Sequence, residues 1–189
     1  MAKSASYSDA LHRLVVALNE TGIRYALTGA AAVGYYGIPR TSMDIDVVMR
    51  GNLSDAQIET LATALSKNGF TASKKEIHRA VDGSEVKFQA FDDRSGYLRI
   101  DMFLERSFGR VSTRIDGLTL WFRTFEELLA KKIQYGDLEE AKLLLRRRGR
   151  FQKDKISRFL NSKQKTELDR LLKQAKAEED STLRSFYPF

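Results

Sequence analysis

Three aspartates supply the chemistry that stands out in this sequence. Asp44 and Asp46 are two residues apart at the start of a segment, 44–49, that is predicted to form a strand. Because strand side chains alternate between faces, both carboxylates point to the same side. Two carboxylates that close together are unfavourable unless a cation or basic group neutralises them. Asp101 lies in a second predicted strand, 98–104, and joins the pair if the two strands are neighbours. Three such carboxylates predict a site for a hard cation, typically Mg²⁺.

The rest of the composition agrees with oxygen ligands. The chain of 189 residues has no Cys and two His, which excludes disulfides, thiolate metal sites and a cysteine nucleophile. Any metal would therefore be bound through oxygen. The hydrophobic content of 42% is enough to fill a core, and the length suits one domain or one domain with an extension.

A small-residue turn precedes the acidic strand. Residues 25–27 are predicted to form a strand that runs into Thr28-Gly29-Ala30 and a short helix. A strand, a glycine and a helix start present free backbone N–H groups, which suit a phosphate. By itself the same pattern also fits a Gly-Ala helix packed tightly on a sheet.

The elements that must position these residues follow from periodicity and capping. A helix is predicted between Ser8 and Gly22, and a second one begins at a capping box formed by Ser54 and Gln57. Residues 70–122 are predicted to be short strands and turns, including a hairpin turn at 116–117. After a capping box at Thr124 and Glu127, three or four amphipathic helices follow. The order predicts an α+β half and then an all-helical half.

Residues 28–46 resemble the signature of the nucleotidyltransferase superfamily, the DNA polymerase beta-like fold. The run Tyr36-Gly37-Ile38-Pro39-Arg40-Thr41-Ser42-Met43-Asp44-Ile45-Asp46 is most similar to AbiEii-like and minimal nucleotidyltransferases, several of which are toxins of toxin–antitoxin systems. The match covers 25–49, and Asp101 extends it. The resemblance implies a mixed sheet flanked by helices with a C-terminal helical extension, divided into a catalytic core at 1–123 and a basic helical region at 124–189.

The resemblance also implies a role for each matching residue. Asp44, Asp46 and Asp101 would be catalytic and would hold two Mg²⁺ ions, with Asp101 helping to deprotonate an attacking hydroxyl. The residues that would contact the NTP substrate are Gly29, Ala30, Arg40, Thr41, Ser42 and Lys132. Ala30 stands where the family has Ser or Gly, and Gly136 where it has a second helical Lys. The expected reaction moves NMP from an NTP to a hydroxyl acceptor and releases pyrophosphate.

The helical half holds most of the positive charge. Residues 131–176 contain 15 Lys and Arg against 6 Asp and Glu, whereas the whole chain has a net charge of +7. A cluster of this kind can bind the phosphates of a nucleic acid or an acidic antitoxin. It can also have no partner and simply form the solvent-exposed faces of the helices. The candidate contact residues are Arg146, Arg147, Arg148, Arg150, Lys153 and Lys155.

Several functional alternatives stay open at this level. The acceptor could be RNA or tRNA, a protein, or a small molecule such as an aminoglycoside, although no acidic acceptor cluster is evident beyond the three aspartates. The chain could instead be a catalytically weak module that binds nucleic acid or a partner protein. With no signal-like N-terminal stretch and no apolar run of about 20 residues, the chain is expected to be cytoplasmic and not to bind membranes.

Overall fold

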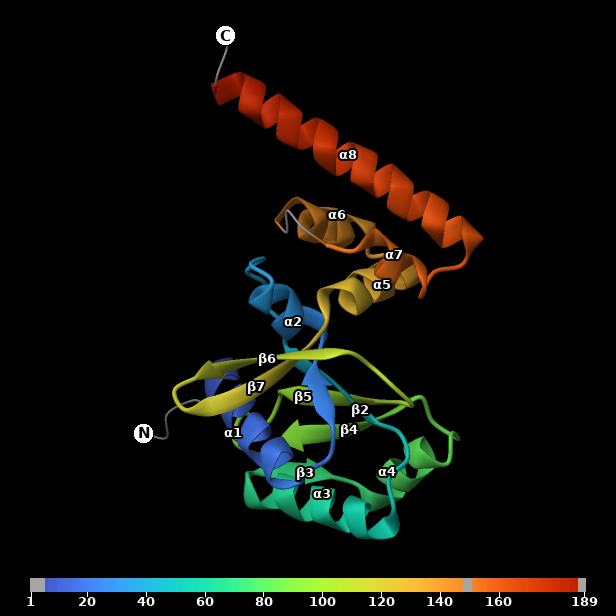
Figure 1. Cartoon of the computed structure of the whole chain (residues 1–189). Helices are drawn as coiled ribbons and strands as arrows, with labels where there is room; N and C mark the ends of the chain where they lie inside the picture. The colour runs from blue at the N-terminus through green and yellow to red at the C-terminus, as the bar shows by residue number, and fades with distance from the viewer. Residues whose placement is uncertain (1–5, 148–150, 187–189) are drawn as a thin grey trace. The chain divides into compact units, whose positions relative to one another are not determined.

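The computed structural model describes residues 6–147 and 151–186 (Figure 1). Contacts between residues divide the chain into two compact units. The first unit contains the chain up to Ala32 and then Arg40–Arg123. The second contains Val33–Pro39 and the chain from Thr124 onward. The change from mixed α/β to helical structure therefore falls between Arg123 and Thr124.

The first unit is built on a seven-stranded mixed sheet with the strand order β3-β4-β5-β2-β1-β7-β6. The strands are β1 (Tyr25–Leu27), β2 (Asp44–Arg50), β3 (Phe70–Ala72), β4 (Lys87–Asp92), β5 (Arg99–Glu105), β6 (Arg110–Ile115) and β7 (Leu118–Arg123). Strands β2 and β5 are parallel neighbours, and β4 pairs antiparallel with β5 on its other side. The predicted hairpin turn is confirmed, with Asp116 and Gly117 at φ 49° and 80° between β6 and β7.

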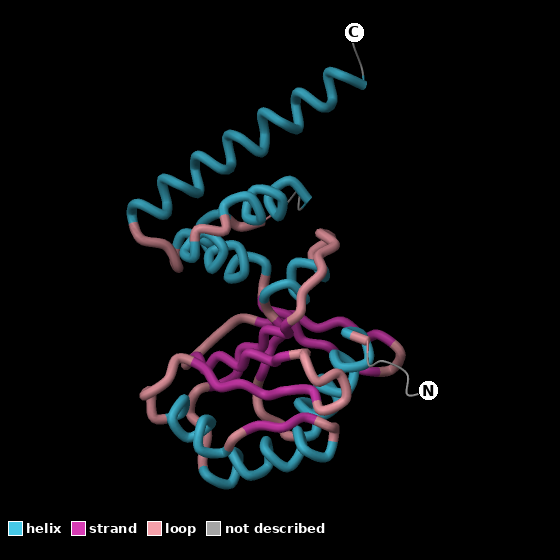
Figure 2. Tube along the Cα trace, turned by 180° about the vertical axis from the view of Figure 1, so that it is seen from behind, coloured by secondary structure: helices cyan, strands magenta, loops and turns pink. Residues whose placement is uncertain are grey.

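Helices α1 (Tyr7–Glu20) and α3 (Asp55–Lys67) pack against each other beside the sheet (Figure 2). The sheet face that lacks the carboxylates is apolar, and Ile45, Val47 and Ile100 are fully buried. Because side chains alternate along a strand, this burial leaves the residues between them on the opposite face. The core therefore orients β2 and β5 so that their aspartates share the other face.

Local signals explain where these helices begin. The predicted capping box of α3 is confirmed, since Ser54 and Gln57 satisfy each other's backbone N–H groups. Helix α1 is capped by Ser6 rather than by Ser8, because the Ser6 hydroxyl accepts from the Asp9 N–H. Helix α4 (Lys74–Val81) lies in a segment predicted to contain only strands and turns, and Ser73 caps it.

The second unit contains four C-terminal helices. They are α5 (Phe125–Tyr135), α6 (Leu138–Arg147), α7 (Lys153–Ser157) and α8 (Ser162–Phe186). Helix α6 packs against α5 and α8, and α5 also packs against α7. Thr124 occupies the N-cap of α5 without a capping hydrogen bond from its side chain, so the capping box predicted there is wrong. Among the described residues no helix combines the length and apolarity that crossing a membrane requires. The predicted α+β class with a helical C-terminal extension is confirmed.

Candidate active site

The three aspartates lie on one face of the sheet, as the sequence predicts. In the parallel pair, Asp46 of β2 lies opposite Asp101 of β5, and Asp44 lies opposite Arg99. The condition on which the prediction depends, that these two strands are neighbours, is therefore met. Asp44 and Asp46 lie at the start of β2, directly after the preceding loop, and both are partly exposed.

Asp44 is more accessible than Asp101. Its side chain is 33% exposed. The Ser42 hydroxyl donates a short hydrogen bond to Asp44 Oδ1, and Arg99 Nη2 lies 3.2 Å from Asp44 Oδ2. The Arg99 side chain is itself 43% exposed, so it can move into solvent when another cation approaches.

Asp46 lies directly against the turn before α2 (Gly29–Tyr35). Gly29 has φ 53°, in the left-handed region, and a Cβ added there would overlap Asp46 Oδ2. The Thr28 N–H donates to the Asp46 carbonyl at 2.9 Å, which holds the turn to the strand. Only glycine therefore meets both the backbone and the space requirement. The glycine predicted to approach phosphate is, in this structure, the residue that makes room for a carboxylate.

Asp101 is almost fully buried, and donors face both of its oxygens. Lys87 Nζ lies 2.5 Å from Oδ2, and Gln89 Nε2 donates to Oδ1 at 2.8 Å. Arg99 Nε lies 3.2 Å from Oδ1, in an ion pair that lacks hydrogen-bond alignment. Arg99 therefore bridges Asp44 and Asp101. Within the described residues, no group of three or more His, Cys, Asp or Glu side chains is arranged to hold a metal ion.

Tyr7 is a further residue in the electrostatic field of this face. Burial, together with the negative charges of Asp46 and Asp44, raises the pKa of Tyr7 to about 12. Tyr7 therefore stays a neutral hydroxyl at physiological pH.

The other predicted nucleotide contacts divide between the two units. Arg40, Thr41 and Ser42 belong to the loop that enters β2, and Ala30 is buried in the first turn of α2. Lys132 belongs to the second unit, where its ammonium lies 2.6 Å from Glu140 and 3.0 Å from Asp137. Burial opposes the charge on Lys132, but the hydrogen bonds that its ammonium donates to the carboxylates of Glu140 and Asp137 outweigh burial and raise its pKa. Lys132 is thus a firmly charged ammonium.

The predicted nucleic-acid contacts are partly neutralised within the second unit. Arg146 pairs with Glu178 at 3.0 Å, and Lys153 pairs with Asp169 at 2.6 Å. Arg147 lines a hollow formed with residues 37–39 and Leu143. Two further predicted contacts, Arg148 and Arg150, lie outside the described residues, and Lys155 is exposed.

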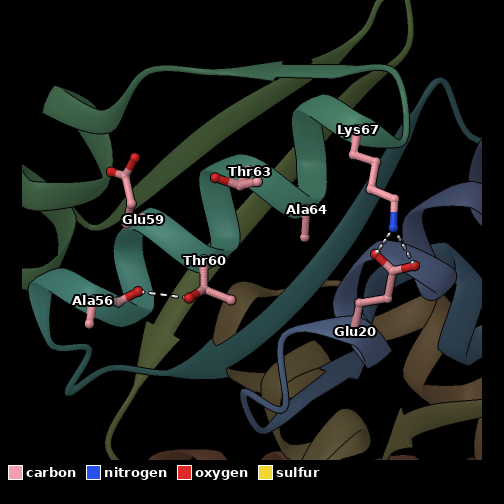
Figure 3. A pocket seen from close by; sticks show the side chains of 7 residues that line it. All are labelled: Glu20, Ala56, Glu59, Thr60, Thr63, Ala64 and Lys67. Carbon is pink, nitrogen blue, oxygen red and sulfur yellow. Dashed lines mark hydrogen bonds and ion pairs between the residues drawn. The ribbon is translucent and has the colours of Figure 1, made fainter.

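A second hollow lies on the first unit, away from every predicted site residue (Figure 3). Its charged walls come from Glu20, Glu59 and Lys67. The Lys67 ammonium lies 3.4 Å from Glu20, and Glu59 pairs with Lys74 at 2.6 Å. These charges are therefore paired, and none of the residues that line the hollow is a predicted catalytic or binding residue.

Sequence reasoning missed the basic and amide partners of the carboxylates. Lys87, Gln89 and Arg99 all share the aspartate face, because they alternate along β4 and β5 in register with Asp101. The alternation of side chains between the two faces of a strand, in 87–89 and 99–101, was the signal that could have placed these residues on the aspartate face. It becomes informative only when the neighbouring strand and its register are known.

Comparison with solved structures identifies the fold. The structure is similar to the solution structure of the antibiotic-resistance factor ANT(2'')-Ia, at a TM-score of 0.50 and 11% identity over 95% of this chain and 96% of that chain. A crystal structure of ANT(2'')-Ia in complex with adenylyl-2''-tobramycin gives a TM-score of 0.53 and 12% identity over 85% and 95%. An antigenic nucleotidyltransferase-like protein from Paracoccidioides brasiliensis gives 0.51 and 19% over 95% and 88%.

These likenesses define the class of structure: the chain has the nucleotidyltransferase fold. They span nearly the whole of this chain and of the neighbours, so the helical half belongs to the likeness as well. No protein-family model matches the sequence, and no curated protein matches it either. The fold assignment therefore comes from structure and agrees with the resemblance drawn from residues 25–49.

Proposed function

We propose that this protein is an Mg²⁺-dependent nucleotidyltransferase that moves NMP from an NTP to a hydroxyl acceptor. One observation carries the proposal. Asp44, Asp46 and Asp101 share one face of the parallel β2–β5 pair, and Gly29 leaves Asp46 the space that any other side chain would fill. Carboxylates that share one face repel one another and cost stability unless cations neutralise them, so the packing of the core alone gives no reason to place three of them there.

The donor set suits a hard divalent cation. Asp44 and Asp46 offer oxygen ligands on one side of a strand, and Asp44 is open to solvent. When bound, such an ion polarises phosphate oxygens and stabilises the charge that develops during displacement at phosphorus. Asp44 and Asp46 would hold it there, next to the backbone turn at Gly29 and Ala30.

The remaining residues would bind and orient the reactants. Arg40, Thr41 and Ser42 belong to the loop before β2 and would contact the phosphates. For Lys132, which is a charged ammonium of the second unit, a phosphate contact is implied by the resemblance alone. Asp101 would accept the proton of the attacking hydroxyl. That oxygen then forms a bond to the α-phosphorus, while the bond to pyrophosphate breaks and the pyrophosphate leaves.

For the acceptor we favour RNA, including tRNA, over a small molecule. Arg147 and Lys155 are the described basic residues of the predicted patch that have no carboxylate partner among the described residues, so they are available to phosphates. Transfer to a protein, and a toxin role with a cognate antitoxin as in AbiEii-like proteins, belong to the same proposal through the resemblance of residues 36–46. The neighbour ANT(2'')-Ia forms a complex with adenylyl-2''-tobramycin, so a small molecule is the alternative acceptor to test against RNA.

A catalytically weak binding module is the second candidate. It is favoured by the cations that already lie on the carboxylates, with Lys87 on Asp101 and Arg99 on Asp44. A protein of this kind would keep the fold as a scaffold and bind nucleic acid or a partner without transfer.

The test is incubation of the chain with each α-labelled NTP, Mg²⁺ and, in separate arms, total RNA, cell protein and an aminoglycoside mixture. Wild type should label one acceptor pool, and Asp44→Asn should reduce labelling by about a hundredfold or more, because a bound metal contributes several kcal/mol to such a step. Glu85→Gln is the matched control, since it removes one exposed negative charge from the same unit. Labelling that survives Asp44→Asn would refute the site. Binding of RNA without any labelling would favour the second candidate.

A further inference from the structure

The environment of Asp101 differs from that of Asp44 in the candidate site. Its side chain is 5% exposed, and both of its oxygens already face donors of β4, with Lys87 Nζ at 2.5 Å and Gln89 Nε2 at 2.8 Å. A metal ligand must turn a lone pair toward the ion at about 2.0–2.1 Å for Mg²⁺. A divalent ion on Asp101 would therefore share a nearly buried carboxylate with an ammonium, and two cations there would repel each other.

Lys87 is also held in place from the other side. In the antiparallel β4–β5 pair it lies opposite Phe103, and its ammonium is 5.4 Å from the centroid of the Phe103 ring. A cation over a ring face gains a further attraction. Only 31% of the Lys87 side chain is exposed. Lys87 is therefore fixed by an ion pair and an aromatic ring together.

The cation at Asp44 is held more loosely. Arg99 reaches Asp44 Oδ2 at 3.2 Å with a side chain that is 43% exposed, and its Nε contact to Asp101 lacks hydrogen-bond alignment. An incoming ion can displace Arg99 into water, where an ion pair with so much exposure costs little to break. The two ends of the acidic face are thus unequal: Asp44 is open to exchange, and Asp101 is occupied.

We propose that the Lys87 ammonium is the resident cation of Asp101, so that the acidic face takes one divalent ion, at Asp44 and Asp46, instead of two. This inference rests on the proposed nucleotidyl transfer and deepens its metal site. Asp101 is then no ligand but a carboxylate that Lys87 and Gln89 hold in a fixed orientation beside the ion. Lys87 supplies, as part of the chain, the positive charge that a second ion would bring.

The test counts Mn²⁺ bound to the full chain by electron paramagnetic resonance, with Mn²⁺ as the only added ligand. Wild type should bind one Mn²⁺ at this face. Lys87→Met keeps the length of the side chain but removes its charge, and it should either add a second Mn²⁺ or tighten binding about tenfold. Lys75→Met is the matched control, because Lys75 is exposed on α4, and it should behave as wild type.

Two further variants keep the proposal testable if Lys87→Met fails to fold. Asp101→Asn should leave Mn²⁺ affinity within about twofold of wild type, whereas Asp44→Asn should weaken it about tenfold or more. Two Mn²⁺ ions on wild type, loss of binding in Asp101→Asn, or a folded Lys87→Met with wild-type binding would each overturn the inference. Mn²⁺ binding that is absent, or that Asp44→Asn leaves unchanged, would refute the proposed metal site itself, which separates the two failures.

Discussion

Replacing Gly29 by alanine is expected to remove activity while leaving most of the stability. The added methyl group would lie 2.7 Å from Asp46 Cγ and 2.9 Å from Asp46 Cβ, and closer still to Oδ2. Real Cβ atoms essentially never approach other heavy atoms within 3.0 Å. Because the Asp46 Cβ itself is too near, rotation of the carboxylate alone cannot relieve the overlap. The Asp46 side chain and its strand must shift together.

The magnitude has two parts that a control variant can separate. An alanine at positive φ costs about 1–2 kcal/mol of stability. Gly22 has φ 67° and nothing within 4 Å of an added Cβ, so Gly22→Ala should show the backbone cost alone. A shift of about 1 Å in a catalytic group can lower the rate about a hundredfold. Gly29→Ala should therefore lose about a hundredfold in transfer, whereas Gly22→Ala should keep wild-type transfer and show only the backbone cost in stability.

The assays are urea unfolding for the free energy and α-labelled NTP transfer for the rate. In a chain of this size, a loss of 1–2 kcal/mol would lower the Tm by roughly 2–8 °C, which leaves both variants folded at room temperature. Full transfer activity in Gly29→Ala would show that the contact of Gly29 with Asp46 does not matter to the site. Equal loss of transfer in both variants would assign the effect to backbone strain and refute the reasoning.

Three further outcomes are expected. Burial opposes ionisation of Asp92, but its hydrogen bonds, led by the one that Arg13 donates at 2.7 Å, lower the pKa of Asp92 below 3.8. The pair therefore stabilises the fold fully above about pH 4, and this stabilisation is lost as the pH falls through the lowered pKa. Asp92→Asn should flatten that acid limb in unfolding curves measured between neutral and acid pH; a limb as steep as that of wild type would contradict the assignment. Arg147→Gln should reduce the slope of log K against log salt for RNA binding by about one, and an unaltered slope would exclude Arg147 from the interface. Ser54→Ala should cost about 1 kcal/mol because it removes a capping box, whereas Thr124→Ala should cost less in the same unfolding assay because Thr124 makes no capping hydrogen bond.

Local patterns predicted the parts of the fold that depend on local physics. The alternation of 44–49 and 98–104 gave two strands with their aspartates on one face, and the apolar residues between them are buried as expected. Whether these two strands pair depends on contacts between residues far apart in the chain, which periodicity does not report. The sequence could therefore predict that the aspartates share a face only if the strands are neighbours. Helix α4 was missed because its eight residues bury only Ile77 and Ala80, which is too short an apolar pattern to separate a helix from a turn.

The partners of the carboxylates were beyond sequence reasoning for the same reason. Lys87 precedes Asp101 by 14 residues, and nothing in its surroundings in the chain marks it as a partner. It reaches Asp101 because β4 runs antiparallel beside β5, in a register that places Gln89 opposite the aspartate. A family signature includes only the residues of the motif. Lys87 lies outside that motif, and its contact with Asp101 depends on the register of β4 and β5.

The charge of the acidic face bears on the choice of acceptor, which the fold alone cannot decide. Three carboxylates share the face with the ammonium of Lys87 and the guanidinium of Arg99, so the described groups come close to neutral before any metal binds. In the proposed mechanism a divalent ion would make the face positive, and the triphosphate of an NTP would supply the negative charge it attracts. The described groups of this face would then have no surplus of negative charge to attract a polycationic acceptor such as an aminoglycoside. Arg147 and Lys155, which have no carboxylate partner within the described residues, are the cations proposed to bind an acceptor that carries its own phosphates, which is why RNA is the first arm in which labelling is expected.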